Sequence, residues 1–186
     1  SEQRMAVVHY ESKCVCIVNV ESGERVATAG SEGEGPGQLR CPRGVAFSGT
    51  GELYVSDYTL HRISVFDREG QYVRMFGGRG AGEGQFCHPH GLCFTADGNL
   101  VVADRDNNRV QIVREDGTFV RSFGSEGSGD GEFQLPSVVS VGPDGSIAVL
   151  DGSRRVQIFD GEGRFVRSIG SRGDGPGQFE NPCGVA

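Results

Sequence analysis

The segment FCHPHGL at residues 86–92 contains the densest group of possible metal ligands in the sequence: Cys87, His88 and His90. Cysteine and histidine at such short spacing can bind zinc, although a structural zinc site uses four ligands. Cys183 stands at the position of His90 in a later copy of an internal repeat, so one hypothesis is a metal ion held by His90 and Cys183. The alternative is that these are variable loop residues. We adopt that alternative and expect neither a bound metal nor a cofactor.

Catalytic chemistry is not indicated by the other nucleophiles and bases. The four histidines, at positions 9, 61, 88 and 90, lie in different local settings and outside any recognisable Ser/His/Asp or Cys/His motif. Glycine-rich segments such as GSEGEGPG could cradle a phosphate with their backbone N–H groups, but such a loop needs a following helix. These segments lead into strands and carry Glu or Asp instead. We therefore interpret them as flexible crossovers and expect no catalytic residue in the chain.

An aspartate followed by an arginine four or five residues later recurs at fixed places. The aspartates are Asp57, Asp104 and Asp151, and the arginines are Arg62, Arg109 and Arg155. Such an aspartate can accept hydrogen bonds from the backbone of a turn, and the arginine can pair with it. A catalytic site needs one asymmetric constellation, whereas this pair is repeated. We therefore interpret these residues as structural.

The elements that position these residues form an internal repeat. Residues 30–76, 77–123 and 124–169 align with a period of 47, 47 and then 46 residues, and a further copy begins at Gly170. Each copy contains four short runs that alternate between apolar and polar residues, separated by turn signals such as Asp-Gly. This pattern predicts an all-β chain in which every copy is a four-stranded antiparallel meander. Such sheets, packed radially, are the blades of a β-propeller.

The blades expected at the two ends of the chain are incomplete. Residues 1–29 supply three strands, RMAVVHY, KCVCIVNV and ERVATAG, without a first strand, while CGVA at residues 183–186 is a first strand without the other three. The two ends could complete one blade and close a ring of about four blades over residues 1–186. A four-blade ring is tight, however, and we favour part of a longer propeller.

The segments LYVSDYTLHRISVFDREGQYVRMFG and LVVADRDNNRVQIVREDGTFVRSFG, with GEGQFCHPHGLCF, resemble the NHL repeat. The chain has no Trp, which argues against the WD40 class. The resemblance implies a propeller, usually of six blades, that serves as a platform for protein or RNA. Such propellers often form the C-terminal domain of tripartite-motif ubiquitin ligases, and they also occur in peptide-amidating enzymes. A substrate-recognition role in a ubiquitin ligase and a metal-dependent amidating enzyme are therefore both implied as possibilities.

One rim of the propeller is the expected binding face, because the crossovers and the turns between the second and third strands meet there. The residues expected to project from this rim are Arg43, Tyr58, His61, His90, Arg105, Asn107, Asn108 and Arg154. Arg and Tyr are favoured anchors at protein interfaces, while Arg, Asn and His also suit RNA. Acidic residues in the crossovers would repel phosphate. We therefore expect a protein partner, with RNA as the alternative.

The net charge and the spacing of the cysteines argue against several classes of protein. The net charge of −7 provides no global basic field for DNA or for an anionic membrane, and the apolar runs are far too short to span a bilayer. The six cysteines fall at irregular spacings that do not follow the repeat, so we expect reduced thiols rather than disulfides. This usage favours a cytoplasmic location.

Overall fold

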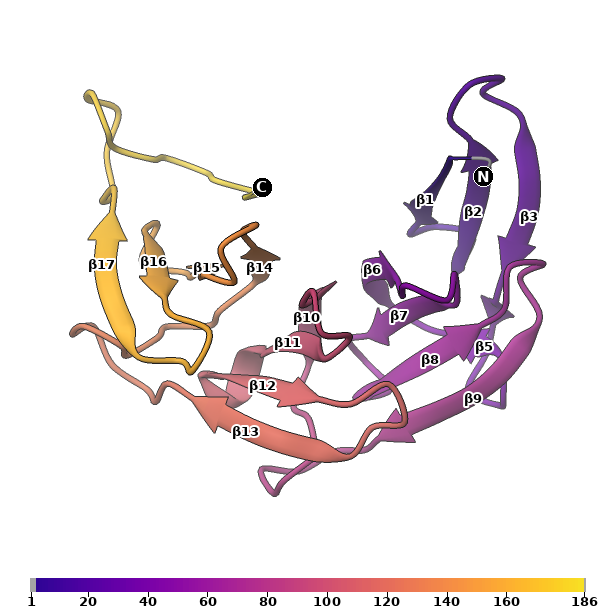
Figure 1. Ribbon diagram of the computed structural model, residues 1–186, viewed down its shortest axis with the longest axis horizontal. Coiled ribbons are helices and arrows are strands. Elements are labelled where there is room, and N and C mark those ends of the chain that lie inside the picture. The colour runs from indigo at the N-terminus through magenta and orange to yellow at the C-terminus, as the bar shows by residue number, and fades with distance from the viewer. Residues whose placement is uncertain (1–2, 186) are drawn as a thin grey trace. The chain divides into compact units, whose positions relative to one another are not determined.

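The computed structural model describes residues 3–185 and is built from antiparallel sheets that follow one another along the chain (Figure 1). In each of these sheets the strands are hydrogen-bonded in chain order, as in a meander. The predicted fold class, all-β with four-stranded propeller blades, is confirmed. The chain divides into two compact units, Ser1–Pro89 and His90–Ala186.

The first unit contains a three-stranded and a four-stranded sheet. The three strands predicted in residues 1–29 are β1 (Arg4–His9), β2 (Cys14–Asn19) and β3 (Arg25–Ala29). The four-stranded sheet consists of β6 (Pro42–Phe47), β7 (Leu53–Asp57), β8 (Arg62–Phe66) and β9 (Tyr72–Gly77). A short parallel pair, β4 (Ser31–Glu32) and β5 (Gln38–Leu39), lies in the crossover between the two sheets.

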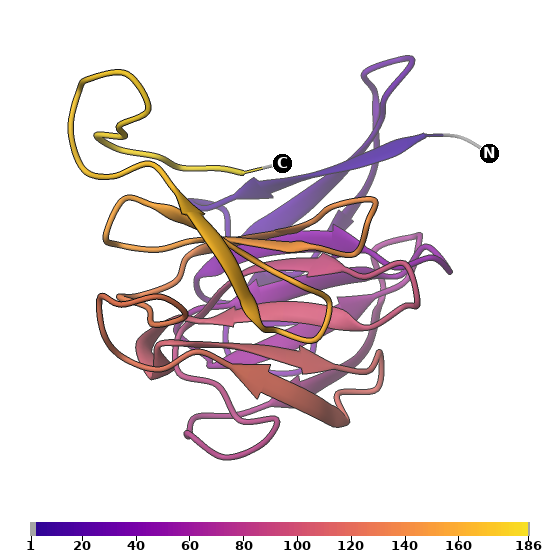
Figure 2. The same cartoon turned by 60° about the vertical axis from the view of Figure 1, so that its left-hand side comes forward.

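The second unit contains two four-stranded sheets. The first consists of β10 (Pro89–Phe94), whose first residue still belongs to the first unit, β11 (Leu100–Asp104), β12 (Arg109–Val113) and β13 (Phe119–Phe123), with a single 3-10 turn, η1 (Arg105–Asn107). The second consists of β14 (Val138–Val141), β15 (Ile147–Leu150), β16 (Val156–Phe159) and β17 (Phe165–Ile169). Beyond β17 the chain continues as a further crossover, in which the parallel bridge Arg172↔Phe179 forms (Figure 2). Residues 183–185 of the strand predicted at CGVA are not in a strand, and Ala186 lies outside the described residues.

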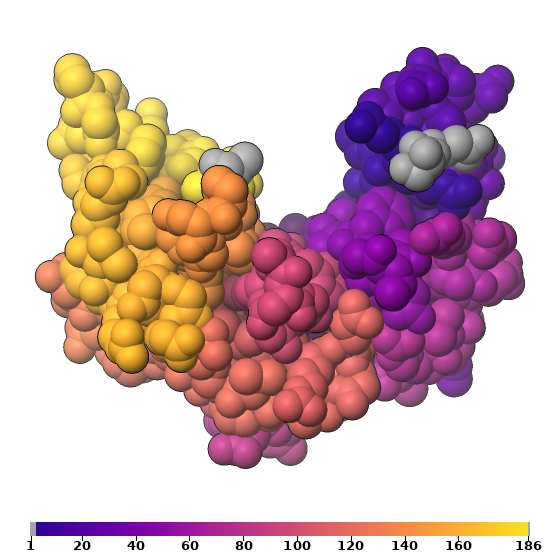
Figure 3. All heavy atoms as spheres, viewed as in Figure 1, coloured from indigo at the N-terminus to yellow at the C-terminus, as the bar shows by residue number. Residues whose placement is uncertain are grey.

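The core of each unit lies between its two sheets. In the first unit Val15 and Ile17 of the three-stranded sheet pack with Val55 and Phe66 of the four-stranded one, and all four side chains are buried. The atoms of these sheets, indigo to purple, lie in direct contact in Figure 3. In the second unit the rings of Phe133 and Phe159 lie 5.4 Å apart, within a cluster that includes β11, β12 and β15. Burial between sheets is therefore what stabilises each blade.

A glycine begins each crossover because a large side chain occupies the space where its Cβ would be. Gly77 has a φ of 95°, and a Cβ on it would lie 2.7 Å from the ring of Phe86. Gly124 repeats this arrangement with a φ of 91° against Phe133. Both the left-handed backbone and the close approach exclude a larger residue. The crossovers are thus held by packed side chains, and parallel bridges such as Arg79↔Phe86 close them.

A buried tyrosine and an ion pair tie β9 to β7 in the sheet that carries most of the candidate site. Arg74 donates to both carboxylate oxygens of Glu52, at 2.9 and 2.8 Å, and its guanidinium lies 5.6 Å over the ring of Tyr54. The hydrogen bond from Arg74 lowers the pKa of Glu52, against the opposing effect of burial. The carboxylate form is therefore stabilised in the folded state.

We expect the Glu52→Gln variant to be less stable than the parent chain at neutral pH and equally stable in acid. A lowered folded-state pKa contributes stability above the ordinary pKa of glutamate, and this contribution is lost as the pH falls through the folded-state pKa. Urea unfolding of both proteins at neutral pH and at about pH 3 measures the difference. A difference that persists unchanged in acid would show that the carboxylate charge is not what stabilises the sheet.

Candidate functional site

The turn after the second strand of each blade, or after the matching strand β1, ends with a residue in the left-handed region. These residues are Lys13 (φ 50°), His61 (φ 54°), Asn108 (φ 50°) and Arg154 (φ 61°). Asparagine adopts this conformation more readily than the other three, so the blade geometry rather than residue preference imposes it. The turns consequently share one backbone conformation, although the chemical type of the side chain differs between copies.

In the first unit these turns and the start of β6 bring together a row of cations and rings. The Lys13 Nζ lies 4.1 Å from the ring centroid of Tyr10, and the Arg43 guanidinium lies 5.0 Å from the same ring. Arg43 also lies 5.5 Å from the ring of Tyr58, which stacks on the ring of His88 at 4.2 Å. We call Tyr10, Lys13, Arg43, Tyr58 and His88 the cation–aromatic row.

The strands explain why the row forms. Tyr10 and Lys13 lie in the turn between β1 and β2, and β1 packs beside β6, at whose start Arg43 stands. Tyr58 directly follows Asp57, which is paired with Pro42 in the register of β6 and β7. Tyr10 is 50% exposed and Arg43 is exposed, whereas Tyr58 and His88 are half-buried. The row is therefore accessible from solvent and anchored at one end.

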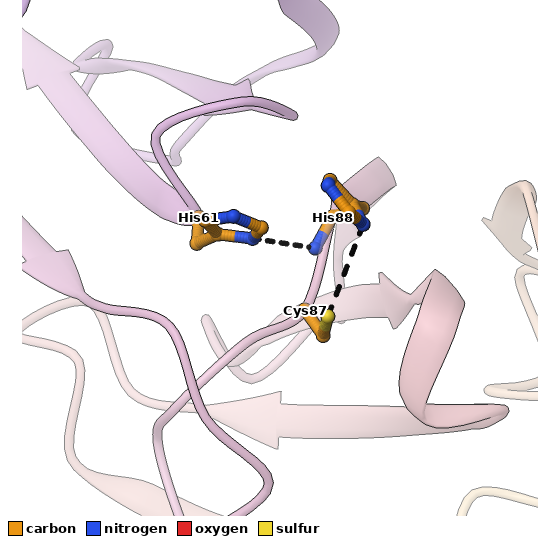
Figure 4. Close-up of side chains that lie close together, drawn as sticks. All are labelled: His61, Cys87 and His88. Carbon is orange, nitrogen blue, oxygen red and sulfur yellow. Dashed lines mark hydrogen bonds between the residues drawn. The ribbon is translucent and has the colours of Figure 1, made fainter.

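His88 of this row also lies close to His61 and Cys87, and Figure 4 shows these three side chains together. The backbone N–H of His88 donates to Nδ1 of His61 at 3.0 Å, and the Cys87 Sγ lies 3.8 Å from Nδ1 of His88. The rings of the two histidines are 4.4 Å apart. One potential ligand atom from each residue lies within 4.8 Å of the others, which within residues 3–185 is the single such group of three or more possible ligands.

The second unit contains the other residues predicted for the binding face. His90 Nδ1 lies 2.8 Å from the carbonyl oxygen of Ser137, and Asn108 Oδ1 accepts the N–H of Leu135 at 2.8 Å. Arg105 pairs with Asp106 at 2.6 Å and Asn107 donates to Asp104 at 2.9 Å. These four residues are thus engaged within the unit. Their side chains are half-buried.

A cleft of about 240 Å³ in the second unit contains two further candidates. Arg154 and Cys183 line it together with Ser137 and Asp151. Cys183 is exposed and its Sγ lies 3.3 Å from the carbonyl of Asn181. The cleft is open and small, and the group of three possible ligands described above includes neither His90 nor Cys183.

The repeated aspartates hold the loops that carry these side chains. Asp57 is fully buried, and its carboxylate accepts the backbone N–H groups of Arg40 and Cys41 in the crossover and of Thr59 and Leu60 in the turn. One carboxylate thus joins two loops that are distant in sequence. The charge-assisted hydrogen bonds replace the water that burial removes.

The arginines that follow these aspartates make different contacts in different blades. Arg109 pairs with Asp104 at 2.7 Å, and Arg155 lies 3.5 Å from Asp151. Burial raises the pKa of Asp151, and the charge of Arg155 opposes this effect. Arg62 donates instead to the carbonyl oxygens of Gly35 and Gln38 in the crossover. Each arginine therefore stabilises a turn or a crossover by an ion pair or by hydrogen bonds.

Sequence reasoning missed two members of the cation–aromatic row and one grouping among the possible metal ligands. Tyr10 and Lys13 lie where the repeat is weakest, yet they occupy the same turn positions as Tyr58 and His61. His61 was assigned to the face but not grouped with Cys87 and His88, because the turn and the crossover are far apart in sequence. A signal was present, because His61 aligns with Asn108 and His88 aligns with Leu135, the pair that meets in the next copy.

Comparison with known proteins identifies the repeat and the fold. The model of the NHL repeat matches residues 39–66 and 86–113. The structure is similar to hydrazine synthase from Kuenenia stuttgartiensis (TM-score 0.67, 19% identity, 89% of this chain and 45% of that chain). It is also similar to a protein of unknown function from Bacteroides caccae (TM-score 0.65, 18% identity, 91% of this chain and 58% of that chain). A third similar structure is virginiamycin B lyase from Staphylococcus aureus (TM-score 0.65, 14% identity, 89% of this chain and 52% of that chain).

These similarities extend to the fold and not to an activity. The chain spans about half the length of the solved structures that it matches. No curated protein matches the sequence significantly. Within residues 3–185, none of the helical segments has the length and apolar character needed to cross a bilayer.

We expect Asp57→Asn to destabilise the chain by roughly 3 kcal/mol, because an amide nitrogen would face backbone N–H donors that the carboxylate now satisfies. Urea unfolding followed by circular dichroism measures this change. The control is Asp116→Asn, since Asp116 is exposed and an asparagine oxygen can still accept the N–H of Thr118. Equal midpoints for the two variants would show that Asp57 does not hold the loops.

Proposed function

We propose that this chain, which carries NHL repeats and is built of β-propeller blades, is a non-catalytic platform that binds a protein partner through the cation–aromatic row. The row is the observation that supports the proposal. It gathers two tyrosines, an arginine and a lysine on one surface of the first unit. Tyrosine and arginine are the residues most enriched at the energetic centres of protein interfaces.

The row is ordered before any partner arrives. Arg43 lies over the rings of Tyr10 and Tyr58, and Tyr58 is also stacked on His88. Side chains held in this way lose less conformational freedom on binding than free ones. Part of each ring face is covered within the chain, and the exposed residues Tyr10 and Arg43 present a phenol and a guanidinium group to a partner. Such polar groups suit the backbone carbonyls and carboxylates of a protein.

The role proposed within a longer protein rests on the family resemblance. The resemblance to tripartite-motif proteins implies that such a propeller recognises the substrate of a ubiquitin ligase. In that setting the row would select the substrate, and the catalytic step would belong to another domain.

RNA is the second candidate, because alternating cations and rings also suit stacked bases and phosphates. Two features favour protein. The ring faces that would stack on bases already have partners inside the chain, and the net charge of −7 opposes a polyanion. The two candidates differ in salt dependence, which is steep for RNA because counterions are released on binding.

We expect Arg43→Ala and Tyr58→Ala each to weaken binding of the partner by on the order of tenfold or more, as truncation of an interface anchor does. The immobilised chain is incubated with a nuclease-treated native extract, and proteins are compared by quantitative mass spectrometry between the parent and the variants. Dissociation constants are then measured with the purified protein that depends on the row.

Arg68→Ala is the matched control for Arg43→Ala. Arg68 is exposed in the same four-stranded sheet, but it lies in the turn between β8 and β9, at the opposite end of β8 from the turn that holds Tyr58. Binding that falls equally in Arg68→Ala, or that survives both row variants, would place the interface elsewhere. Capture that occurs only in a parallel extract without nuclease, and that weakens steeply with salt, would favour RNA instead.

A further inference from the structure

Comparison of the repeat copies shows which features of positions 61, 87 and 88 the fold requires and which occur only in this copy. In the second unit Asn108 Oδ1 accepts the N–H of Leu135, and in the first unit His61 Nδ1 accepts the N–H of His88 in the same way. The equivalent sets in the other copies are Lys13, Arg40 and Cys41; Asn108, Gln134 and Leu135; and Arg154, Glu180 and Asn181. Each of these other sets contains at most one histidine or cysteine, so the fold does not require these residue types at the three positions.

The three side chains already approach the geometry of a metal site. Two zinc bonds of about 2.1 and 2.3 Å at the tetrahedral angle place their ligand atoms about 3.6 Å apart. Cys87 Sγ and His88 Nδ1 are 3.8 Å apart, and the ligand atoms of all three residues lie within 4.8 Å of one another. Closure of His61 onto a shared ion needs a movement on the order of 1 Å.

We propose that His61, Cys87 and His88 bind a divalent cation of the zinc class. Two imidazoles and one thiolate form a nitrogen and sulfur donor set, which selects zinc over magnesium and calcium. All three residues are half-buried, so solvent can reach the cluster. The fourth coordination position is therefore available to water or to a group from a partner.

Metal binding at this site would replace the hydrogen bond between His88 and His61 with a shared ion. A histidine that binds a metal through one ring nitrogen carries its proton on the other nitrogen. Metal-bound His61 therefore cannot accept the N–H of His88, and that hydrogen bond is replaced by the shared ion. The turn after β7 and the crossover before β10 stay linked, now through side chains instead of a backbone N–H.

Cobalt titration of the reduced parent chain tests the proposal, because Co²⁺ reports on both geometry and sulfur ligation. We expect the visible bands of tetrahedral Co²⁺ and a thiolate-to-cobalt charge-transfer band, both removed by added Zn²⁺. Cys87→Ser should abolish the charge-transfer band. His61→Asn should weaken cobalt binding by more than about 100-fold, because loss of a ligand costs more than the loss of an outer-shell partner.

His61→Asn is designed to keep the fold, since asparagine performs the same acceptor role at position 108. Circular dichroism checks this directly, and Cys87→Ser gives an independent variant. Cys183→Ser is the matched control because Cys183 is an exposed free thiol, and it should leave the spectrum unchanged.

Either of two results would overturn the site. One is that the parent chain lacks a thiolate-to-cobalt band that depends on Cys87 and His61. The other is a band that Cys183→Ser abolishes while Cys87→Ser leaves it intact, which would assign the metal to Cys183. The measurements use the chain alone, so they stand apart from the search for a partner.

Discussion

The carboxylate at the end of the second strand is the constraint on which the candidate site depends. In the first unit Asp57 accepts two backbone N–H groups from the crossover and two from the turn, so it fixes two loops with one buried charge. Every side chain of the cation–aromatic row except His88 stands on one of these loops, on the strand end beside them, or on the matching turn of the neighbouring sheet. Without that anchor the turn that carries Tyr58 would no longer be tied to the crossover that leads into Arg43.

The fold was predictable from the sequence because the same strand and turn signals recur in every copy of the repeat. Each copy shows strand alternation, hairpin turns and a glycine where a ring must approach the backbone, as Gly77 and Gly124 do. Errors in one copy are corrected by the others. The short parallel bridges in the crossovers were not predicted, because they depend on a few backbone contacts that the side-chain pattern does not encode.

The candidate site was predictable only in part, because its contacts join loops that are far apart in sequence. Arg43, Tyr58 and His61 were placed on the binding face from their register alone. Their neighbours Tyr10 and Lys13 were missed, because residues 1–29 match the repeat weakly and their pattern indicates strands without marking individual turn residues. The left-handed turn residue is the feature that aligns these loops, and it becomes visible only when φ is known.

His88 belongs both to the cation–aromatic row and to the group of three possible metal ligands, so the two proposals are physically coupled. Its ring stacks on Tyr58, and ligation would fix that ring in place and thereby order the row further. A divalent ion adds two positive charges, of which the thiolate of Cys87 offsets one. With Arg43 and Lys13 nearby, the metal-bound surface would be more positive than the metal-free one. Such a surface would favour an acidic segment on the proposed protein partner.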